Sequence, residues 1–462
     1  MSNSDLHRSG RIAVCVILFW LGGCVNWSGD VALYRKVLDG AQPTTRPAFD
    51  PADPLPLTRA LALANADNEA IASRGEDYIQ ALAEKMRQAG TFLPTLTLGP
   101  SYTLTNTDGI PNSGGAAAVG ESRGGTSHQF TVPANASATG SLSNASNLQA
   151  AGYTVEQRAQ LLLNERETIL LQVAQSYYTV LRAERQADVY VNGLKLKAEK
   201  VRDQELRLKL GNVKPLDLAQ SQADLAGTRA RLTQSQTDAA NARSALARLV
   251  GVPAVAGPLV DAFEPPAEVG GVDLWRERAL AQRQDLLAAA RTVEAARASL
   301  EAAIRQYFPS VSVNYSYFLY TDPSSLQNWT GAVSANIPIF SALSIEADIR
   351  RAWSVYRQAG LAESQTQRQV IDDINQSFQN LQGSRKRIVD LQIQVEAAQR
   401  AFDLSERAYQ LGSVSNLDRL TQQDSLLLAQ LNLVDEQFSQ KAYYLALLRS
   451  TGRLTSVLQA VQ

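Results

Sequence analysis

The chain has 462 residues with 44 lysines and arginines against 45 aspartates and glutamates, so its formal net charge is −1. The length supports a large core, and the charge balance gives no reason to expect a nucleic-acid partner. An apolar fraction of 45% indicates neither a disordered chain nor a bundle of membrane helices. After the N-terminal segment, no run is long and apolar enough to predict a membrane-spanning helix.

Residue types that carry catalysis or bind metals are scarce. The chain has two histidines, His7 and His128, and two cysteines, Cys15 and Cys24. These are too few for a His/Cys metal site or a serine–histidine triad, and no glycine-rich loop has the pattern of a phosphate-binding loop. Carboxylates on long helices are more often solvated than catalytic. We therefore expect no enzymatic activity, no cofactor and no metal, and we place His128 in a loop.

Residues 1–23 are predicted to be a signal peptide of the lipoprotein type. A short basic head precedes the apolar run 12–20, which is too short to span a membrane. The following Leu-Gly-Gly-Cys resembles a bacterial lipobox, which implies that Cys24 is lipidated, and Val25 resembles the residue found in outer-membrane lipoproteins. An ordinary signal peptide cut nearby is the alternative. A chain without its signal peptide and with Cys24 acylated could form no internal disulfide.

Residues 24–57 are predicted to be a lipid anchor followed by a tether. Proline recurs too often in Asn26–Leu57 for a helix to persist, at Pro43, Pro47, Pro51, Pro54 and Pro56. Thr58 can cap the next helix, which we expect to run to about Ala89 and to end at Gly90.

Two predicted strand hairpins follow, one in each half of the chain. Their apolar residues alternate with small polar ones, which is the period of a strand with one apolar face. A Gly/Ser/Ala-rich loop from Asn106 to Ser127 separates the first two strands. The apolar positions are Leu96, Leu98, Tyr102 and Leu104; Phe130, Val132, Ala134, Ala136 and Ala138; Val311, Val313, Tyr315, Tyr317 and Leu319; and Trp329, Val333, Ala335, Ile337 and Ile339.

These strands are long enough to cross a membrane when tilted, and their two faces suit a barrel with lipid outside and water inside. Two hairpins are too few to close a barrel, so copies of the chain must complete it. The alternative is a soluble sandwich in which the apolar face is the core.

Long helices make up most of the remaining chain. In the first, apolar residues recur every seven positions from Val173 to Leu208, a pattern that makes helices supercoil around neighbours. At ~1.5 Å per residue, the longest helices come to roughly 100 Å. The predicted helices are Ser141–Leu210, Pro215–Val250, Leu274–Tyr307, Ser341–Leu411 and Asn416–Thr451.

The chain is an internal duplication. A shift of 412 − 211 = 201 residues places Gly412 on Gly211 and Asp418 on Asp217, and the heptad positions upstream follow the same shift. We therefore predict a first repeat at 58–251, a linker at 252–271, a second repeat at 272–452 and a tail at 453–462.

This duplicated hairpin, with Y-x-L-G-x-x-x-x-L-D at its second turn, resembles the outer membrane efflux protein family, the TolC-like exit ducts of bacterial pumps. The resemblance implies an α+β membrane protein that forms a homotrimer, with twelve strands in one outer-membrane β-barrel and the helices in a periplasmic tube. It also implies a passive conduit for efflux or secretion, with a periplasmic adaptor and an inner-membrane pump as partners. The cargo stays open among drugs, metal ions and proteins.

The resemblance further implies that the adaptor docks on the helix tips, formed by Leu210, Gly211, Asn212, Val213, Leu411, Gly412, Ser413 and Val414. Each tip glycine is equally consistent with a simple helix C-cap.

A pore gate is the second site that the resemblance implies. Asp418 lies where TolC-like proteins carry a pore-facing aspartate, whereas Thr421 and Val414 replace a second aspartate and an arginine. We expect one acidic ring, with Leu417 and Leu420 as candidates for apolar closure. The alternative is that Asp418 only caps its helix, as Asp217 could in the first repeat.

A non-channel periplasmic coiled-coil scaffold or adhesin is the alternative function. Such a protein needs heptads, but it has no use for four amphipathic strands placed at matching points of two repeats.

Overall fold

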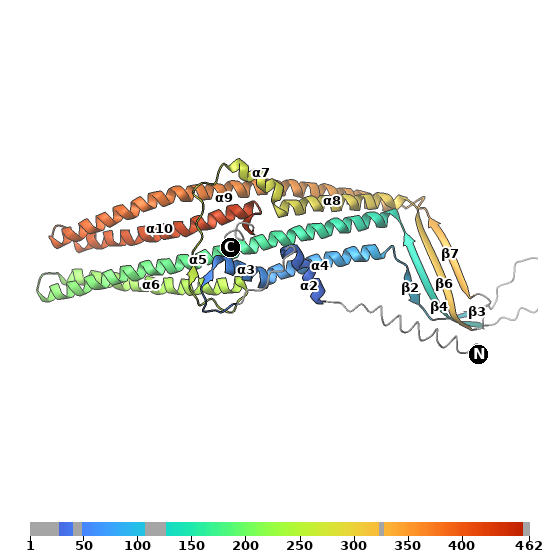
Figure 1. The fold of residues 1–462 in the computed structure, drawn as a ribbon, viewed down its shortest axis with the longest axis horizontal. Coiled ribbons are helices and arrows are strands. Elements are labelled where there is room, and N and C mark those ends of the chain that lie inside the picture. Colours follow the sequence, from blue (N-terminus) through green and yellow to red (C-terminus); the bar gives the residue numbers. More distant parts are fainter. Residues whose placement is uncertain (1–26, 40–48, 107–125, 323–327, 456–462) are drawn as a thin grey trace, which may run out of the picture.

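The computed structural model describes residues 27–39, 49–106, 126–322 and 328–455. A small sheet lies at one end of an elongated body, and long helices extend from it to two hairpin tips at the other end (Figure 1). The helices are α2 (Trp27–Asp39), α3 (Leu57–Asp67), α4 (Glu69–Gly90), α5 (Leu142–Lys209), α6 (Pro215–Val250), α7 (Val272–Gln282), α8 (Gln284–Ile304), α9 (Ser344–Gln410) and α10 (Asn416–Ser450). The strands are β1 (Leu55–Pro56), β2 (Thr95–Leu98), β3 (Ser101–Asn106), β4 (Thr126–Gly140), β5 (Leu259–Val260), β6 (Ser310–Asp322) and β7 (Trp329–Asn336).

The predicted helical hairpins are confirmed as α5–α6 and α9–α10. The side chain of Ser141 caps α5 by accepting a hydrogen bond of 3.1 Å from the backbone N–H of Asn144. Along α5, the heptad residues Val173, Val180 and Val201 are buried, so the seven-residue pattern marks the packed face of the helix.

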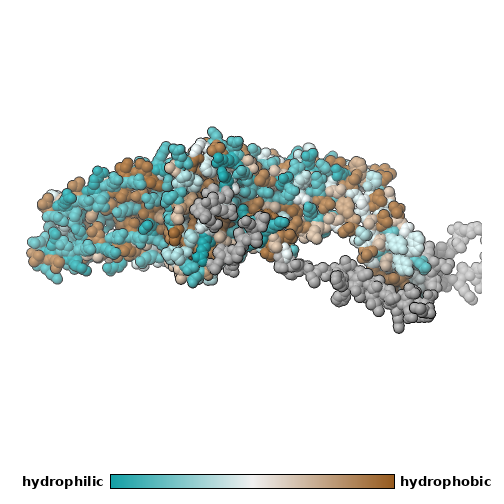
Figure 2. Space-filling view, viewed as in Figure 1, coloured by the Kyte–Doolittle hydropathy of each residue, from teal (hydrophilic) through white to brown (hydrophobic). Residues whose placement is uncertain are grey.

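Hydrophilic residues dominate the visible surface of both hairpins, with apolar residues between them as far as the tips (Figure 2). Among the described helices, none is sufficiently long and apolar to cross a membrane.

The predicted tether contains a helix, so the expectation that Asn26–Leu57 lacks one is wrong. The prolines begin only at Pro43, which leaves Trp27–Asp39 free to form α2. The side chains of Tyr34 and Leu38 are buried where this helix packs against the body of the protein.

The single helix predicted from Thr58 to Ala89 is two helices, α3 and α4, which meet at Asn68. This residue has extended backbone geometry, and its side chain accepts a hydrogen bond of 3.0 Å from the N–H of Ala70 and donates one of 2.8 Å to the carbonyl of Leu249. Asn68 therefore caps α4 at the break and connects it by a hydrogen bond to the end of α6.

The helix predicted at Leu274–Tyr307 is likewise interrupted, between α7 and α8, at Arg283. This buried guanidinium pairs with Asp285 at 2.9 Å and with Asp373 at 2.6 Å. The last three predicted residues form a short 3-10 turn.

The main core lies midway along the molecule, where the linker crosses the helices. There β1 and β5 pair in parallel and so connect the segment before α3 to the linker. The hydroxyl of Tyr177 lies 2.8 Å from the carbonyl oxygens of both Leu55 and Val260. Gly257 is required at this point, because a Cβ there would lie 2.1 Å from the carbonyl oxygen of Asp53.

The two predicted strand hairpins are present and are joined into one antiparallel sheet, with β2 and β3 beside β4, then β6, then β7. Cross-strand partners keep the apolar residues on one face, for example Ala136 opposite Tyr315 and Val313 opposite Val333. His128 lies in β4 and not in a loop. Within one chain this sheet encloses no core, because its large apolar residues are exposed.

Candidate functional site

The two hairpin tips have the same backbone construction. Gly211 and Gly412 adopt left-handed φ angles of 76° and 75°. The following residues close each turn. The N–H of Asn212 donates to the carbonyl of Arg207 at 2.9 Å, and the N–H of Ser413 donates to the carbonyl of Ala408 at 2.9 Å. This is the common way to end a helix with glycine.

The leucines at both tips are largely solvent-exposed, at 74% for Leu210 and 84% for Leu411. A Cβ at Gly211 or at Gly412 would meet nothing within 4 Å. The tips therefore present apolar and small side chains on an open surface, which is what a docking partner needs.

The structure places Asp418 in a capping box at the start of α10. Its carboxylate accepts hydrogen bonds from the backbone N–H of Ser415 at 3.2 Å and from the Ser415 hydroxyl at 2.7 Å, and that hydroxyl accepts one from the Asp418 N–H. The Ser415 hydroxyl and N–H lower the pKa of Asp418, which is therefore charged near neutral pH. The first repeat has no matching capping box, since the N-cap residue of α6, Lys214, makes no side-chain cap hydrogen bond.

The two leucines expected to close the pore by apolar contact differ in exposure. Leu417 is 59% exposed, whereas Leu420 is buried within the chain. Of the three gate candidates, Asp418 and Leu417 are exposed on a single chain and Leu420 is not.

Sequence reasoning missed an ion cluster, centred on a buried lysine, that joins the two hairpins behind the tips. Lys197 on α5 is only 2% exposed, and its ammonium lies 2.7 Å from Asp224 on α6 and 2.6 Å from Asp424 on α10. One cation of the first hairpin therefore holds carboxylates from both hairpins.

A second polar cluster lies nearer the tips and centres on Asn416, the first residue of α10. Its amide nitrogen donates to the Asp217 carbonyl at 3.0 Å, and its amide oxygen accepts from Gln204 at 3.0 Å and from Arg419 at 2.8 Å. The guanidinium of Arg419 also lies over the ring of Tyr409, 5.1 Å from its centre.

Glu406 completes this second cluster by pairing with Lys200 at 2.6 Å and with Arg419 at 3.5 Å. Burial alone would raise the pKa of Glu406, but the hydrogen bond and charge of Lys200, together with the charge of Arg419, outweigh burial and lower it. The stability that follows is present at neutral pH and is lost as the pH falls through this lowered pKa.

The sequence did contain a signal for these clusters. Lys197 and Gln204 each follow an apolar heptad residue, Leu194 or Val201, by three positions, which places them in the packed seam of α5. A polar residue at such a position specifies the partner and register of helices at a cost in stability.

Comparison with known protein families identifies the family of the chain. The family model of the outer membrane efflux proteins matches residues 62–252 and 275–453, which is most of the chain and includes both repeats. The chain belongs to the outer membrane efflux protein family.

Relatives of the chain bear different names. The chain is 26% identical over 319 residues to the outer membrane efflux protein BepC of Brucella suis, covering 67% of this chain and 69% of BepC. It is also 26% identical over 372 residues to the cation efflux system protein CusC of Escherichia coli, covering 76% and 80% of the two chains.

Solved structures of outer-membrane channels share the fold. The outer-membrane channel OprN superposes with a TM-score of 0.76 at 20% identity, covering 91% of this chain and 92% of OprN. A crystal structure of CusC superposes with a TM-score of 0.75 at 19% identity, covering 86% and 91%. The family fold thus accounts for the sheet and for both helical hairpins.

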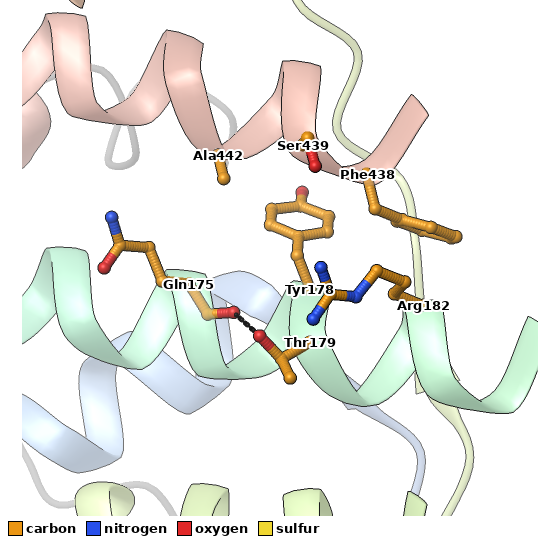
Figure 3. A pocket seen from close by; sticks show the side chains of 7 residues that line it. All are labelled: Gln175, Tyr178, Thr179, Arg182, Phe438, Ser439 and Ala442. Atoms are coloured by element: carbon orange, nitrogen blue, oxygen red, sulfur yellow. Dashed lines mark hydrogen bonds between the residues drawn. The ribbon is translucent and has the colours of Figure 1, made fainter. Parts of the chain in front are cut away.

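A small cavity lies between α5 and α10 of this efflux protein. It has a volume of about 150 Å³ and is lined by Gln175, Tyr178, Thr179, Arg182, Phe438, Ser439 and Ala442 (Figure 3). The Tyr178 side chain is 2% exposed, and its hydroxyl has no hydrogen-bond partner within the described residues.

The neighbouring tyrosines Tyr177 and Tyr178 give a matched pair of variants. We expect Tyr177→Phe to lower the free energy of unfolding by about 1.5 kcal/mol, because the buried Leu55 carbonyl and the partly buried Val260 carbonyl lose their donor. Tyr178→Phe should change it by less than about 0.5 kcal/mol, because that hydroxyl bonds no protein group. Thermal unfolding of both variants in detergent checks the difference, and equal losses would contradict it.

The described residues offer no metal site, since no three His, Cys, Asp or Glu side chains among them are placed to hold an ion. The predicted lipidation residue, Cys24, lies outside the described residues.

Proposed function

We propose that the chain is the outer-membrane channel of a tripartite efflux system, a passive homotrimeric conduit from the periplasm to the exterior. The observation that supports this most is the sheet, whose apolar face and two edges, unpaired within the described residues, are what one part of a barrel would present. Three copies would supply twelve strands, and the duplicated hairpins would continue the barrel as a periplasmic tube.

We also infer that the partners are a periplasmic adaptor, which docks on the exposed tips, and an inner-membrane pump. The relatives bear names of cation efflux, pyoverdine export and antibiotic efflux systems. Such varied cargo on one architecture favours a conduit that discriminates weakly among cargo molecules and has no enzymatic role. The inner-membrane pump would then select the cargo.

Two measurements test this function together. Native mass measurement in detergent should give three chains, and the same sample should show single-channel conductance in a planar bilayer. A stable monomer without conductance would favour the scaffold or adhesin instead.

The lipid anchor is a separate proposal. One relative, SilC of Salmonella typhimurium, is named a probable outer membrane lipoprotein, which supports lipidation of Cys24. Mass spectrometry of the mature N-terminus should find acylated Cys24, and Cys24→Ala should abolish the modification while the barrel retains some function. An unmodified N-terminus at another residue would contradict the proposal.

The gate proposal gives Asp418 a second role, as one member of a ring of carboxylates that attracts cations. Asp418→Asn removes the charge but keeps an oxygen that can accept the cap hydrogen bond, so cation selectivity and divalent-ion block should fall while stability changes little. Ser415→Ala is the matched variant, because it removes the cap and keeps the charge. Ser415→Ala should lower the free energy of unfolding by about 1 kcal/mol and leave cation selectivity unchanged. Unaltered selectivity in Asp418→Asn would remove Asp418 from the gate.

A further inference from the structure

One buried polar atom in the cavity between α5 and α10 lacks a partner. The side chain of Tyr178 is 2% exposed, and its hydroxyl makes no hydrogen bond within the described residues. The side chain points across the cavity toward Ser439 and Ala442 of α10 (Figure 3). Buried polar groups in native proteins are nearly always hydrogen-bonded, and an unmade bond there destabilises the fold. The Tyr178 hydroxyl therefore indicates a position where a guest molecule can bind.

Aromatic packing fixes the direction of this hydroxyl. The Tyr178 ring lies nearly perpendicular to that of Tyr177, with centroids 5.7 Å apart and an interplanar angle of 83°. The ring of Phe438, which belongs to α10, lies 6.3 Å away at an angle of 34°. Contacts at these distances favour one arrangement of the rings, so the hydroxyl is held in place and does not turn toward another protein group.

The polar neighbours of Tyr178 on α5 are engaged elsewhere. Thr179 donates its hydroxyl to the carbonyl of Gln175 at 2.8 Å. Arg182 donates from Nη1 to the carboxylate of Asp435 at 3.0 Å, which balances its positive charge. The cavity thus presents the Tyr178 donor beside two aromatic rings, and the ion pair at its wall carries no net charge.

The state of Tyr178 and the size of the cavity define the guest. Burial raises the pKa of Tyr178, and the charges of Asp261 and Glu264 raise it further, so the hydroxyl stays protonated and can donate. A field that holds the proton on Tyr178 also disfavours an anion beside it. The volume is about 150 Å³, and a cavity of about that size holds one benzene molecule.

The helix faces show where the cavity opens. The Tyr177 hydroxyl on α5 donates to a carbonyl of β5, and the Lys441 ammonium on α10 lies 2.7 Å from Asp261, so both side chains face the linker. Thr179 and Ser439 lie two residues away on their helices, which is about 200° around each axis. The cavity therefore opens on the side opposite the linker, where Thr179 is exposed.

We propose that this cavity binds a neutral molecule with a single aromatic ring and an acceptor group that takes a hydrogen bond from the Tyr178 hydroxyl. The direction in which the cavity opens rests on the proposed function. A linker across the bore would block a conduit, so the linker lies outside the tube and the cavity opens into the bore. Aromatic cargo of this size then pauses at the cavity on its way through the channel.

Benzamide tests the site, because it has one ring, no charge and a carbonyl acceptor. Isothermal titration of the full-length channel in detergent should show one benzamide per chain, with detergent alone as the baseline. Tyr178→Phe removes the donor and should weaken binding about fivefold, the equivalent of one neutral hydrogen bond. Benzoate has the same ring but a negative charge, so it should bind more weakly than benzamide.

Two further variants separate the cavity from the rest of the core. Tyr177→Phe removes a hydroxyl that faces the linker, so the affinity for benzamide should stay unchanged. Ala442→Leu should abolish binding, because it fills the cavity. Equal affinities of the unaltered chain and Tyr178→Phe would overturn the proposal. Failure of benzamide to bind the unaltered chain would also overturn it, since the cavity would then hold water only.

A planar bilayer tests the direction of opening. Ser439→Cys treated with a bulky thiol reagent should lower the single-channel conductance, and benzamide should slow the reaction. The unaltered chain with the same reagent sets the background from its own cysteines. A conducting channel that the reagent leaves unchanged would place the cavity outside the bore and overturn this part of the proposal. A chain that binds benzamide but never conducts would overturn the proposed channel and leave the binding site intact.

Discussion

Replacing Lys197 by methionine should lower the free energy of unfolding by about 2 kcal/mol, less than for a fully buried ion pair that loses one member, because the Asp424 side chain is 44% exposed and stays partly solvated. The ammonium of Lys197 is the shared partner of Asp224 and Asp424. Methionine has a similar length but no charge, so the two carboxylates would face each other without a cation. Asp224 belongs to the first hairpin and Asp424 to the second. We therefore expect the two hairpins to separate first around position 197.

Lys195 provides the control for this prediction. It lies two residues away on the same helix but is exposed, so Lys195→Met should change stability by less than about 0.5 kcal/mol. Adding Asp224→Asn to Lys197→Met should recover part of the loss, since it removes one of the stranded charges. Thermal unfolding in detergent, with hydrogen exchange on α5 and α10, measures both effects. Equal stability of the Lys195 and Lys197 variants would show that the cluster contributes nothing.

Arginine at either hairpin tip should reduce efflux to that of cells lacking the channel. Asn212 and Ser413 follow the tip glycines on an open surface, so Asn212→Arg and Ser413→Arg add bulk and charge where the adaptor is proposed to dock. Folding and trimer formation should be unaffected, because both residues are exposed in the structure. Resistance assays and adaptor co-purification would measure the loss.

Ser413→Ala is the matched control at the tip. It removes the hydroxyl, which donates to the Ala408 carbonyl at 2.9 Å, but adds neither bulk nor charge, so efflux should persist. If both arginine variants retained full resistance, the tips would not be the docking surface.

The fold was largely predictable because its signals are local. A seven-residue apolar period along α5 marks a supercoiled helix, and a two-residue period marks each strand. Gly211 and Gly412 mark the turns, since glycine adopts the left-handed backbone at little cost. Repetition of these signals after 201 residues made the architecture clear without any knowledge of tertiary contacts.

The interruptions of helices were harder to predict. Asn68 ends one helix and caps the next, and its amide nitrogen also donates to the carbonyl of Leu249, 181 residues away. Arg283 interrupts another helix where it meets Asp373. In both places the apolar pattern continues across the break, and a distant hydrogen bond or charge helps to stabilise it.

The sequence by itself thus determined the duplicated hairpins, the amphipathic strands and the exposed tips, because periodicity depends on neighbours within a few residues. Only the tertiary structure decided that Lys197 is buried between two hairpins and that Asn416 joins them. A charged residue in a heptad seam can be solvated or paired, and its state depends on carboxylates that lie 27 and 227 residues away in the chain. The desolvation of such a charge is tolerable only when those partners are in place, so the arrangement follows from the packing of the hairpins and not from the local pattern.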